Sequence, residues 1–181
     1  MTAFPFDTNP NEPTKLGLIV LSSDETIEDE FRAMLPKSCS LFQTRIHSAP
    51  EVTPDTLMEM KAGLAASAAM IPPSFNVDVI GYACTSGATM IGPNNVAAEV
   101  QKVHPNSQVC TPITAVMRAL NTLGARKIGM VTPYIPDVSQ EMRNLLIENG
   151  FDISTLVSFE VSTEAIVARI TADAIKRAVR T

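Results

Sequence analysis

The residues best suited to do chemistry lie together at Cys84-Thr85-Ser86-Gly87, directly after the apolar segment 78–83. Apolar segments of this kind predict a buried strand, and α/β sheets bind ligands at the carboxyl ends of their strands. Two hydroxyls, a glycine and free backbone N–H groups suit a carboxylate, and the partial positive charge of those N–H groups favours a thiolate. The alternative is that Cys84 is a small core residue and that Thr-Ser-Gly only forms a turn. The clustering favours a reactive thiol in a polar cleft, next to a carboxylate site.

An internal repeat points to two further residues. The segment Lys15-Leu-Gly-Leu-Ile is similar to Lys127-Ile-Gly-Met-Val at an offset of 127 − 15 = 112, and Ser22 aligns with Tyr134 at the same offset. If the repeat reflects two similar halves, both side chains face a cleft between them. The alternatives are that Ser22 caps a helix, in a capping box with Glu25, and that Tyr134 is only a loop residue. A chance likeness between two strand-helix units would also account for the repeat.

The elements that must position these residues alternate between strand and helix, which predicts parallel strands with helical crossovers and therefore the α/β class. Thr53-Pro54 and Thr111-Pro112 each place a capping hydroxyl before a proline that opens a helix. The two most apolar strands are expected to be adjacent and central in the sheet. The expected strands cover 16–21, 41–46, 77–83, 108–110, 127–131 and 153–159, and the expected helices cover 57–70, 96–103, 112–123, 136–149 and an amphipathic segment from Ser162 onward.

This pattern predicts two pseudo-symmetric parallel-sheet halves with flanking helices. Residues 1–14 are expected to form a flexible arm, 15–111 the first half, and 112–181 the second half. A counterpart of Cys84 in the second half would fall near position 84 + 112 = 196, whereas the chain given ends at Thr181. We therefore expect the second half to be truncated. A truncated half could leave an inactive carboxylate-binding protein.

Composition excludes several classes of function. The chain has 181 residues, of which 45% are hydrophobic, and a net charge of −5 without a concentrated basic face, so we expect no nucleic-acid partner. We also expect no membrane span and no secretory signal, and hence a cytoplasmic protein. Separately, we expect the protein to form a homo-oligomer. Residues 1–14 contain acidic residues and prolines where a signal would be apolar.

The remaining candidate residues favour neither a metal nor a cofactor. Cys39 and Cys110 have no CxxC partner and are expected to be packing thiols. His47 and His104 stand alone, without a second histidine or carboxylate at ligand spacing, so a zinc site is not supported. Neither standard glycine-rich phosphate loop is present. We expect neither a metal nor a cofactor.

Five segments together carry a resemblance to a known family. The sequence resembles the aspartate/glutamate racemase superfamily, and within it the branch of maleate cis-trans isomerases and arylmalonate decarboxylases. The Cys-Thr-Ser-Gly motif is the most specific, since the decarboxylases carry glycine where Cys84 stands. The segments are Gly17-Leu-Ile-Val, Ala49-Pro-Glu-Val-Thr, Ala83-Cys-Thr-Ser-Gly, Thr111-Pro-Ile-Thr-Ala with Leu123-Gly-Ala, and Val131-Thr-Pro-Tyr.

The resemblance implies a cofactor-independent enzyme of the isomerase and racemase type that binds a small carboxylate or dicarboxylate between its two halves. It implies that Cys84 is catalytic and that Ser22, Thr85, Ser86 and Tyr134 bind the substrate. In the isomerase interpretation the Cys84 thiolate adds to the alkene of maleate, the new single bond rotates, and elimination gives fumarate. The alternatives are an amino-acid racemase of the Asp/Glu type, in which Cys84 transfers a proton next to the carboxylate, and a decarboxylase-like enzyme.

Overall fold

Two parallel sheets organise the residues that the computed structural model describes, which are 3–8 and 12–180. The larger sheet has the strand order β2-β1-β3-β4, and the smaller one pairs β5 with β6. The strands are β1 (Thr14–Leu21), β2 (Cys39–Ile46), β3 (Val79–Tyr82), β4 (Gln108–Cys110), β5 (Lys127–Tyr134) and β6 (Asp152–Val161). All pairings in both sheets are parallel. The predicted α/β class is confirmed, and so is the central, adjacent placement of β1 and β3.

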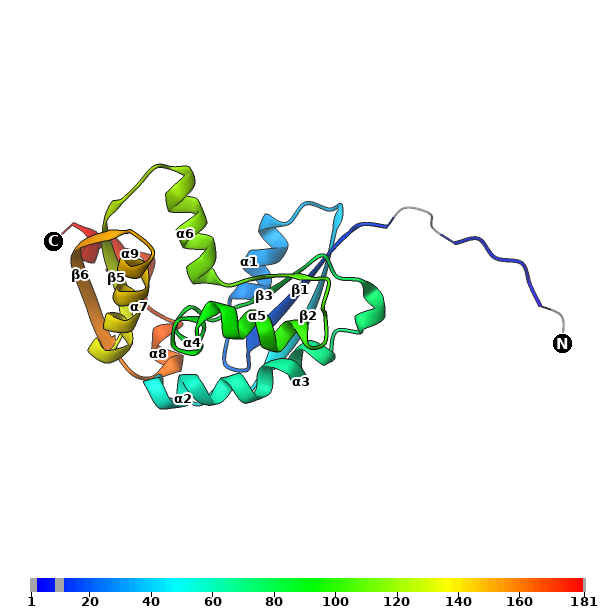
Figure 1. Cartoon of the computed structure of the whole chain (residues 1–181), viewed down its shortest axis with the longest axis horizontal. Coiled ribbons are helices and arrows are strands. Elements are labelled where there is room, and N and C mark those ends of the chain that lie inside the picture. The colour runs from blue at the N-terminus through cyan, green and yellow to red at the C-terminus, as the bar shows by residue number, and fades with distance from the viewer. Residues whose placement is uncertain (1–2, 9–11, 181) are drawn as a thin grey trace.

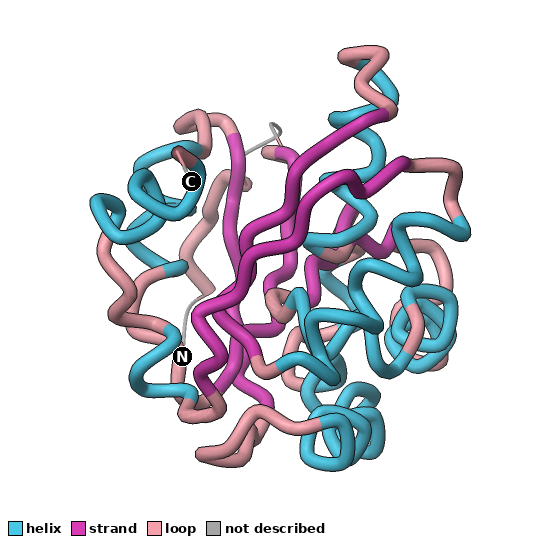
Figure 2. The backbone as a smooth tube through the Cα atoms, turned by 90° about the vertical axis from the view of Figure 1, so that its left-hand side faces the viewer, coloured by secondary structure: helices cyan, strands magenta, loops and turns pink. Residues whose placement is uncertain are grey.

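Helices connect and cover the strands (Figures 1 and 2). Figure 1 shows α2, α3 and α5 on one side of the larger sheet and α1 on the other, while α7 lies with the smaller sheet. The helices are α1 (Ile27–Met34), α2 (Pro54–Glu59), α3 (Leu64–Ala69), α4 (Thr85–Ile91), α5 (Pro93–Gln101), α6 (Pro112–Thr122), α7 (Pro136–Glu148), α8 (Glu164–Val167) and α9 (Ala172–Val179), with short 3-10 turns η1 (Met60–Gly63) and η2 (Pro73–Phe75).

The core forms where the larger sheet meets α3, α4 and α5. Ile19, Leu64 and Ile80 are fully buried there, as are Val96 and Val100. Burial on both faces is what the continuous apolar segments of parallel strands require. Helix α4 packs against α2, α5, α6 and α7, so it lies between the two sheets. The residues at its start are therefore held from both halves of the molecule.

Both threonine-proline helix starts are confirmed. Thr53 and Thr111 each accept a hydrogen bond from the N–H three residues on, and each donates its own N–H to that residue's hydroxyl. A cap of this kind contributes about 1 kcal/mol. Thr111 lies between the last residue of β4 and the first residue of α6. Its cap therefore fixes the point at which the chain leaves the larger sheet.

Two of the predicted elements are wrong in detail. The expected amphipathic helix from Ser162 onward is divided into α8 and α9, with the turn at residues 168–171 between them. Thr171 then caps α9 through a bond from the Ala174 N–H, because a hydroxyl residue in extended conformation opens a new helix instead of continuing the old one. The expected helix 57–70 starts earlier, at Pro54, and tightens into η1 between α2 and α3.

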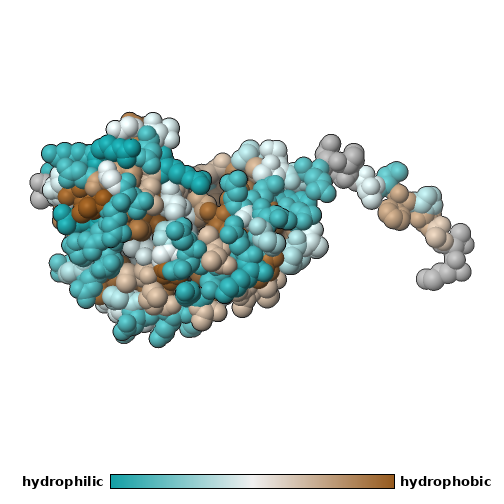
Figure 3. All heavy atoms as spheres, viewed as in Figure 1, coloured by the Kyte–Doolittle hydropathy of each residue, from teal (hydrophilic) through white to brown (hydrophobic). Residues whose placement is uncertain are grey.

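The described part of the predicted arm covers residues 3–8 and 12–14. Residues 3–8 are exposed, carry no helix or strand and extend away from the body of the molecule in Figure 1, whereas Thr14 already starts β1. Residues 1–2 and 9–11 of that arm lie outside the described residues. On the face seen in Figure 3 hydrophilic residues predominate, and apolar residues show as separate patches. Within the described ranges, no helix is long and apolar enough to cross a membrane.

Candidate functional site

Cys84 lies where β3 passes into α4. It is the N-cap residue of that helix, with an extended backbone, and its Sγ accepts a hydrogen bond from the Gly87 N–H at 3.2 Å. The Ser86 Oγ lies 3.7 Å from the same sulfur. Cys84 is only 5% exposed and Ser86 3%. The segment Thr85-Ser-Gly is therefore the first turn of a helix, which corrects the expectation of a loop and explains why several donors surround the thiol.

Tyr82 and Met60 complete the surroundings of the thiol. Tyr82 is fully buried, and its hydroxyl donates to the Met60 Sδ at 3.6 Å. A hydrogen bond between Tyr82 and Cys84 raises the pKa of the phenol, although burial raises it more. A Cβ at Gly87 would lie 2.6 Å from the Tyr82 hydroxyl and 2.9 Å from the Cys84 sulfur. Only glycine allows α4 to approach the phenol and the thiol this closely.

Burial raises the pKa of the Cys84 thiol, and this corrects the expectation of a depressed value. The bonds from Gly87, Ser86 and Tyr82 each favour the thiolate, but the loss of hydration outweighs them, and the negative charge of Glu164 acts in the same direction as burial. The polar groups around Cys84 are thus those expected for a thiolate site. In this ligand-free state the thiol itself is the favoured form.

Tyr134, the last residue of β5, reaches the site from the smaller sheet. Its backbone carbonyl accepts hydrogen bonds from the Ser139 hydroxyl of α7 at 3.1 Å and from the Ser158 hydroxyl of β6. Burial raises the pKa of its phenol, the charge of Cys84 adds to the effect, and a hydrogen bond with Ser86 opposes it. Cys84, Ser86 and Tyr134 therefore form one interacting group drawn from both sheets.

Ser22 follows β1 at the same sheet edge, but it makes different contacts from those expected. Its Oγ lies 3.0 Å from the Ser48 Oγ and accepts the Ser48 N–H at 3.0 Å. The expected capping box with Glu25 is wrong, because α1 begins only at Ile27 and the Asp24 carboxylate accepts the N–H groups of Thr26 and Ile27. Ser22 is exposed and remains available to a ligand.

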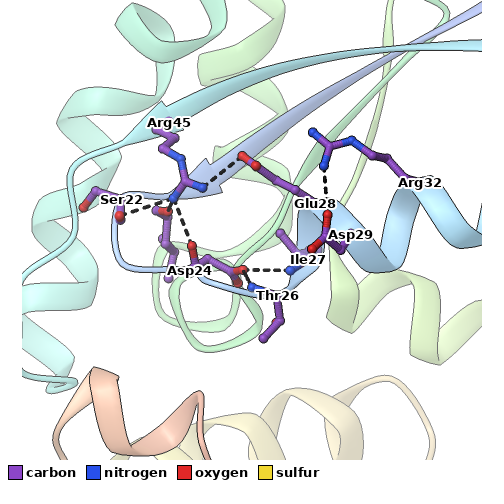
Figure 4. A network of polar contacts seen from close by, with 9 residues as sticks. Ser22, Asp24, Thr26, Ile27, Glu28, Asp29, Arg32 and Arg45 are labelled. Atoms are coloured by element: carbon purple, nitrogen blue, oxygen red, sulfur yellow. Dashed lines mark hydrogen bonds and ion pairs between the residues drawn. The ribbon is translucent and has the colours of Figure 1, made fainter.

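Arg45 holds the loop after β1 in shape (Figure 4). Its Nη1 donates to the carbonyls of Leu21, Ser22 and Asp24 at 2.9, 3.3 and 3.0 Å. Its Nη2 pairs with the Glu28 carboxylate at 2.9 Å. The Arg45 guanidinium thus binds three carbonyls of this loop, which fixes the positions of Ser22 and Asp24 relative to the sheet edge.

Glu164, at the start of α8, is a site residue that the sequence analysis missed. It is half-buried, and its negative charge raises the pKa of both Cys84 and Tyr134. Burial and the charge of Asp24 raise the pKa of Glu164 itself. A signal was present, because Glu164 follows the end of a strand just as Ser22 and Cys84 do.

In the part of the chain that the structure describes, the side chains of the other candidate residues make no hydrogen bond with the group formed by Cys84, Ser86 and Tyr134. Thr85 is half-buried, and its hydroxyl is in no hydrogen bond among the described residues. Cys39 starts β2, at the opposite end of the sheet, and Cys110 ends β4 beside an apolar hollow. The buried His104 bonds the carbonyls of Ala68 and Ile71 with its Nε2. The described residues hold no cluster of three or more potential metal ligands.

Comparisons with known proteins show which enzymes this chain resembles. A maleate isomerase of Pseudomonas putida is 26% identical over 169 residues, which cover 86% of this chain and 67% of that protein. The crystal structure of a Nocardia farcinica maleate cis-trans isomerase variant with a covalently bound succinylcysteine intermediate is 26% identical, with a TM-score of 0.81, over 93% of this chain and 73% of that one. A maleate isomerase of Pseudomonas putida S16 with maleate superimposes with a TM-score of 0.84 at 22% identity, over 94% of this chain and 73% of that one.

A match to a family model adds to these likenesses. The model described as arylmalonate decarboxylase matches residues 16–181, which is nearly the whole chain from β1 onward. A parallel sheet whose strand ends bring a buried cysteine, a serine and a tyrosine together is the arrangement expected from the sequence motifs of that branch. This chain therefore belongs to the arylmalonate decarboxylase family.

Proposed function

We propose that this protein is a cis-trans isomerase of a small dicarboxylate of the maleate type, and that Cys84 is its nucleophile. The observation that carries the proposal is the buried Cys84 sulfur, which receives the Gly87 N–H and lies next to the Ser86 hydroxyl and the Tyr134 phenol. The likeness to an isomerase captured with a succinylcysteine supports addition of a cysteine sulfur to the substrate carbon.

The first step forms a carbon-sulfur bond. The Cys84 thiol first releases its proton to solvent; the lone pair of the resulting thiolate then adds to one alkene carbon, and the π-electron pair moves onto the neighbouring carboxylate. The former double bond is now single, so the two halves of the substrate rotate about it. Return of the electron pair breaks the carbon-sulfur bond and releases the trans isomer and the thiolate. No oxidant, reductant or cofactor enters this balance.

The donors around Cys84 stabilise the charge that moves during the reaction. The Ser86 hydroxyl and the Tyr134 phenol, which interact next to Cys84, are proposed to donate to the substrate carboxylate that gains negative charge in the first step. The half-buried Thr85 hydroxyl, which has no partner among the described residues, is proposed to join them. Fixed hydrogen-bond donors directed at such a charge in a site without water commonly contribute about 2.7–4 kcal/mol each to transition-state stabilisation. Ser22, across the strand ends from Cys84, is proposed to bind the other end of the substrate.

Substitution of Cys84 tests this function directly. The wild-type chain should convert maleate to fumarate, followed by the separation of the two isomers, and mass spectrometry should detect a protein adduct heavier by one substrate molecule. Cys84→Ser should lose both the turnover and the adduct, while substrate binding measured by calorimetry persists because the donors remain. The matched controls Cys39→Ser and Cys110→Ser should keep both.

Two results would contradict the proposal. Undiminished turnover by Cys84→Ser would show that another group is the nucleophile. Calorimetric binding of maleate without turnover or an adduct in the wild-type chain would leave a carboxylate-binding protein.

A further inference from the structure

The segment that carries Glu164 is bound at two places to residues 50–52, which connect β2 to α2. The Val52 N–H donates to the Ser162 carbonyl at 2.7 Å and the Glu164 N–H donates to the Pro50 carbonyl at 3.0 Å, with a bridge between Glu51 and Thr163. On the other side of α8, Arg169 pairs with Glu25 at 3.1 Å. These contacts hold the start of α8 at the edge where β1 and β3 end.

Glu164 lies close enough to Cys84, Tyr134 and Asp24 for their charges to interact. It lines a small recess together with Ser48, which binds Ser22, and Met60, which binds the Tyr82 hydroxyl next to Cys84. The Glu164 carboxylate makes no hydrogen bond or ion pair within the described residues. The neighbouring charged groups are already engaged, since Asp24 accepts two backbone N–H groups and Arg45 and Arg169 each have carboxylate partners.

The site is therefore electrostatically uneven. On one side, the hydroxyls of Ser86 and Tyr134 offer donors to a carboxylate. On the other side, next to Ser22, an unpaired carboxylate lies in a half-buried setting where an approaching negative charge is poorly screened. A dianion such as maleate must place one carboxylate on each side of Cys84, and the second one would meet Glu164. A neutral group with N–H donors would instead satisfy that carboxylate.

We propose that Glu164 determines substrate preference, so that the monoamide of a cis-enedioic acid is a better substrate than the diacid, which is still converted. This inference rests on the proposed function and refines its substrate class. The substrate carboxylate binds Thr85, Ser86 and Tyr134, and the amide N–H at the other end donates to Glu164. The covalent step at Cys84 is unchanged. Maleamate is the simplest compound of this class.

The test compares maleamate with maleate in three proteins: the wild-type chain and two variants. For the wild type, kcat/KM for maleamate should exceed that for maleate by about tenfold, the usual size of one close like-charge interaction. In Glu164→Gln the preference should disappear, because the rate with maleate rises about tenfold. The matched control Glu148→Gln removes one exposed charge at the far end of α7, and it should behave as the wild type.

A second measurement separates this inference from the proposed reaction. Succinamate and succinate have no alkene, so their binding, followed by calorimetry, does not depend on catalysis. Glu164→Gln should tighten succinate binding about tenfold and leave succinamate no tighter. If no protein forms an adduct or a trans product but this binding pattern holds, the isomerase function fails and the role of Glu164 stands. Equal effects of Glu164→Gln and Glu148→Gln on both ligands, or a wild-type preference for the diacid, would overturn it.

Discussion

At the residue scale, the groups around Cys84 shift the pKa of its thiol in opposite directions. Three hydrogen bonds favour the thiolate, whereas burial and the charge of Glu164 favour the thiol, and the balance raises its pKa. Because the thiolate is the reactive form, a thiol with a raised pKa reacts more slowly with oxidants and alkylating agents at neutral pH than an ordinary thiol.

The pH dependence of alkylation tests this balance. In a Cys39→Ser/Cys110→Ser protein, iodoacetamide reacts only with Cys84. Because the pKa is raised, less thiolate is present at pH 7 than for an ordinary thiol with a pKa of about 8.5, and the rate should increase only as the pH rises above that value. Adding Glu164→Gln removes a negative charge, so the midpoint should move to lower pH. Rapid alkylation at pH 7 with a midpoint below 8.5 would contradict the raised pKa.

The sequence was sufficient to place Cys84, Ser86 and Tyr134 at the ends of strands, because each lies at the end of an apolar strand that is recognisable without the structure. It was not sufficient to find Tyr82 or Met60. Their apolar neighbours along the chain are typical of core residues, and their role depends on a contact 22 residues apart. The sequence also could not predict that the pKa of Cys84 is raised, because a motif shows the hydrogen-bond donors but not how deeply the thiol is buried.

At the element scale, the junction between β3 and α4 is tightly packed and also carries the proposed nucleophile, Cys84. Helix α4 starts at the sheet edge with Cys84 as its cap, and it packs against α2 on one side and α7 on the other. The local pattern of strand, cysteine, hydroxyl and glycine was readable from the sequence. The helix that starts at Thr85 could not be predicted, because Thr-Ser-Gly has low helix propensity. The burial of Ala88 and Ile91 in the core is what makes this segment helical.

Substitution of Gly87 tests this joint. In an open helix Gly→Ala stabilises by up to about 1 kcal/mol, but here the new Cβ would lie 2.6 Å from the Tyr82 hydroxyl and 2.7 Å from the Met60 Cε. We expect Gly87→Ala to destabilise the fold by about 1–3 kcal/mol, the usual cost of overpacking, as measured by urea unfolding, and to reduce turnover.

The matched control for this substitution is Gly129→Ala in β5. A Cβ at Gly129 meets no atom within 4 Å, so the change should alter the free energy of unfolding by less than about 0.5 kcal/mol. A Gly87→Ala protein as stable and active as Gly129→Ala would show that Tyr82 and Met60 shift aside without cost.

At the scale of the whole molecule, the site exists only where the two sheets meet. Cys84, Ser86 and Ser22 come from the larger sheet, whereas Tyr134 and Glu164 come from the smaller one. The internal repeat predicted two related sheet units, and it placed Ser22 and Tyr134 after corresponding strands. The contact of α8 with residues 50–52 could not be predicted, because a turn at 168–171 interrupts what the amphipathic pattern indicated as one helix.

The expectation of a truncated second half stays a prediction. The smaller sheet pairs only β5 with β6, and the chain spans about two-thirds of the length of the Pseudomonas putida relative. An apolar hollow of about 450 Å³ lies against β1 and β3, lined by Leu18, Phe31 and Ala115 among others. Hollows of this kind lose the dispersion contacts that a packed interior supplies. Among the described residues the smaller sheet has only two strands, and α7, which packs on them, also packs against α4, so the stability of this sheet is expected to depend strongly on the contact with α4.

Ligand binding should consequently stabilise the smaller sheet as well as the larger one. At a free concentration of about 100 times Kd, a ligand that binds only the folded state adds about 2.7 kcal/mol, which for a chain of this size raises Tm by about 5–10 °C. We expect succinate or succinamate, whichever binds more tightly, to give this rise. It should also slow amide exchange in β5, β6 and α8, because Tyr134 and Glu164 face the ligand. Protection confined to β1–β4 would mean that these two residues do not contact it, and the site would then belong to the larger sheet alone.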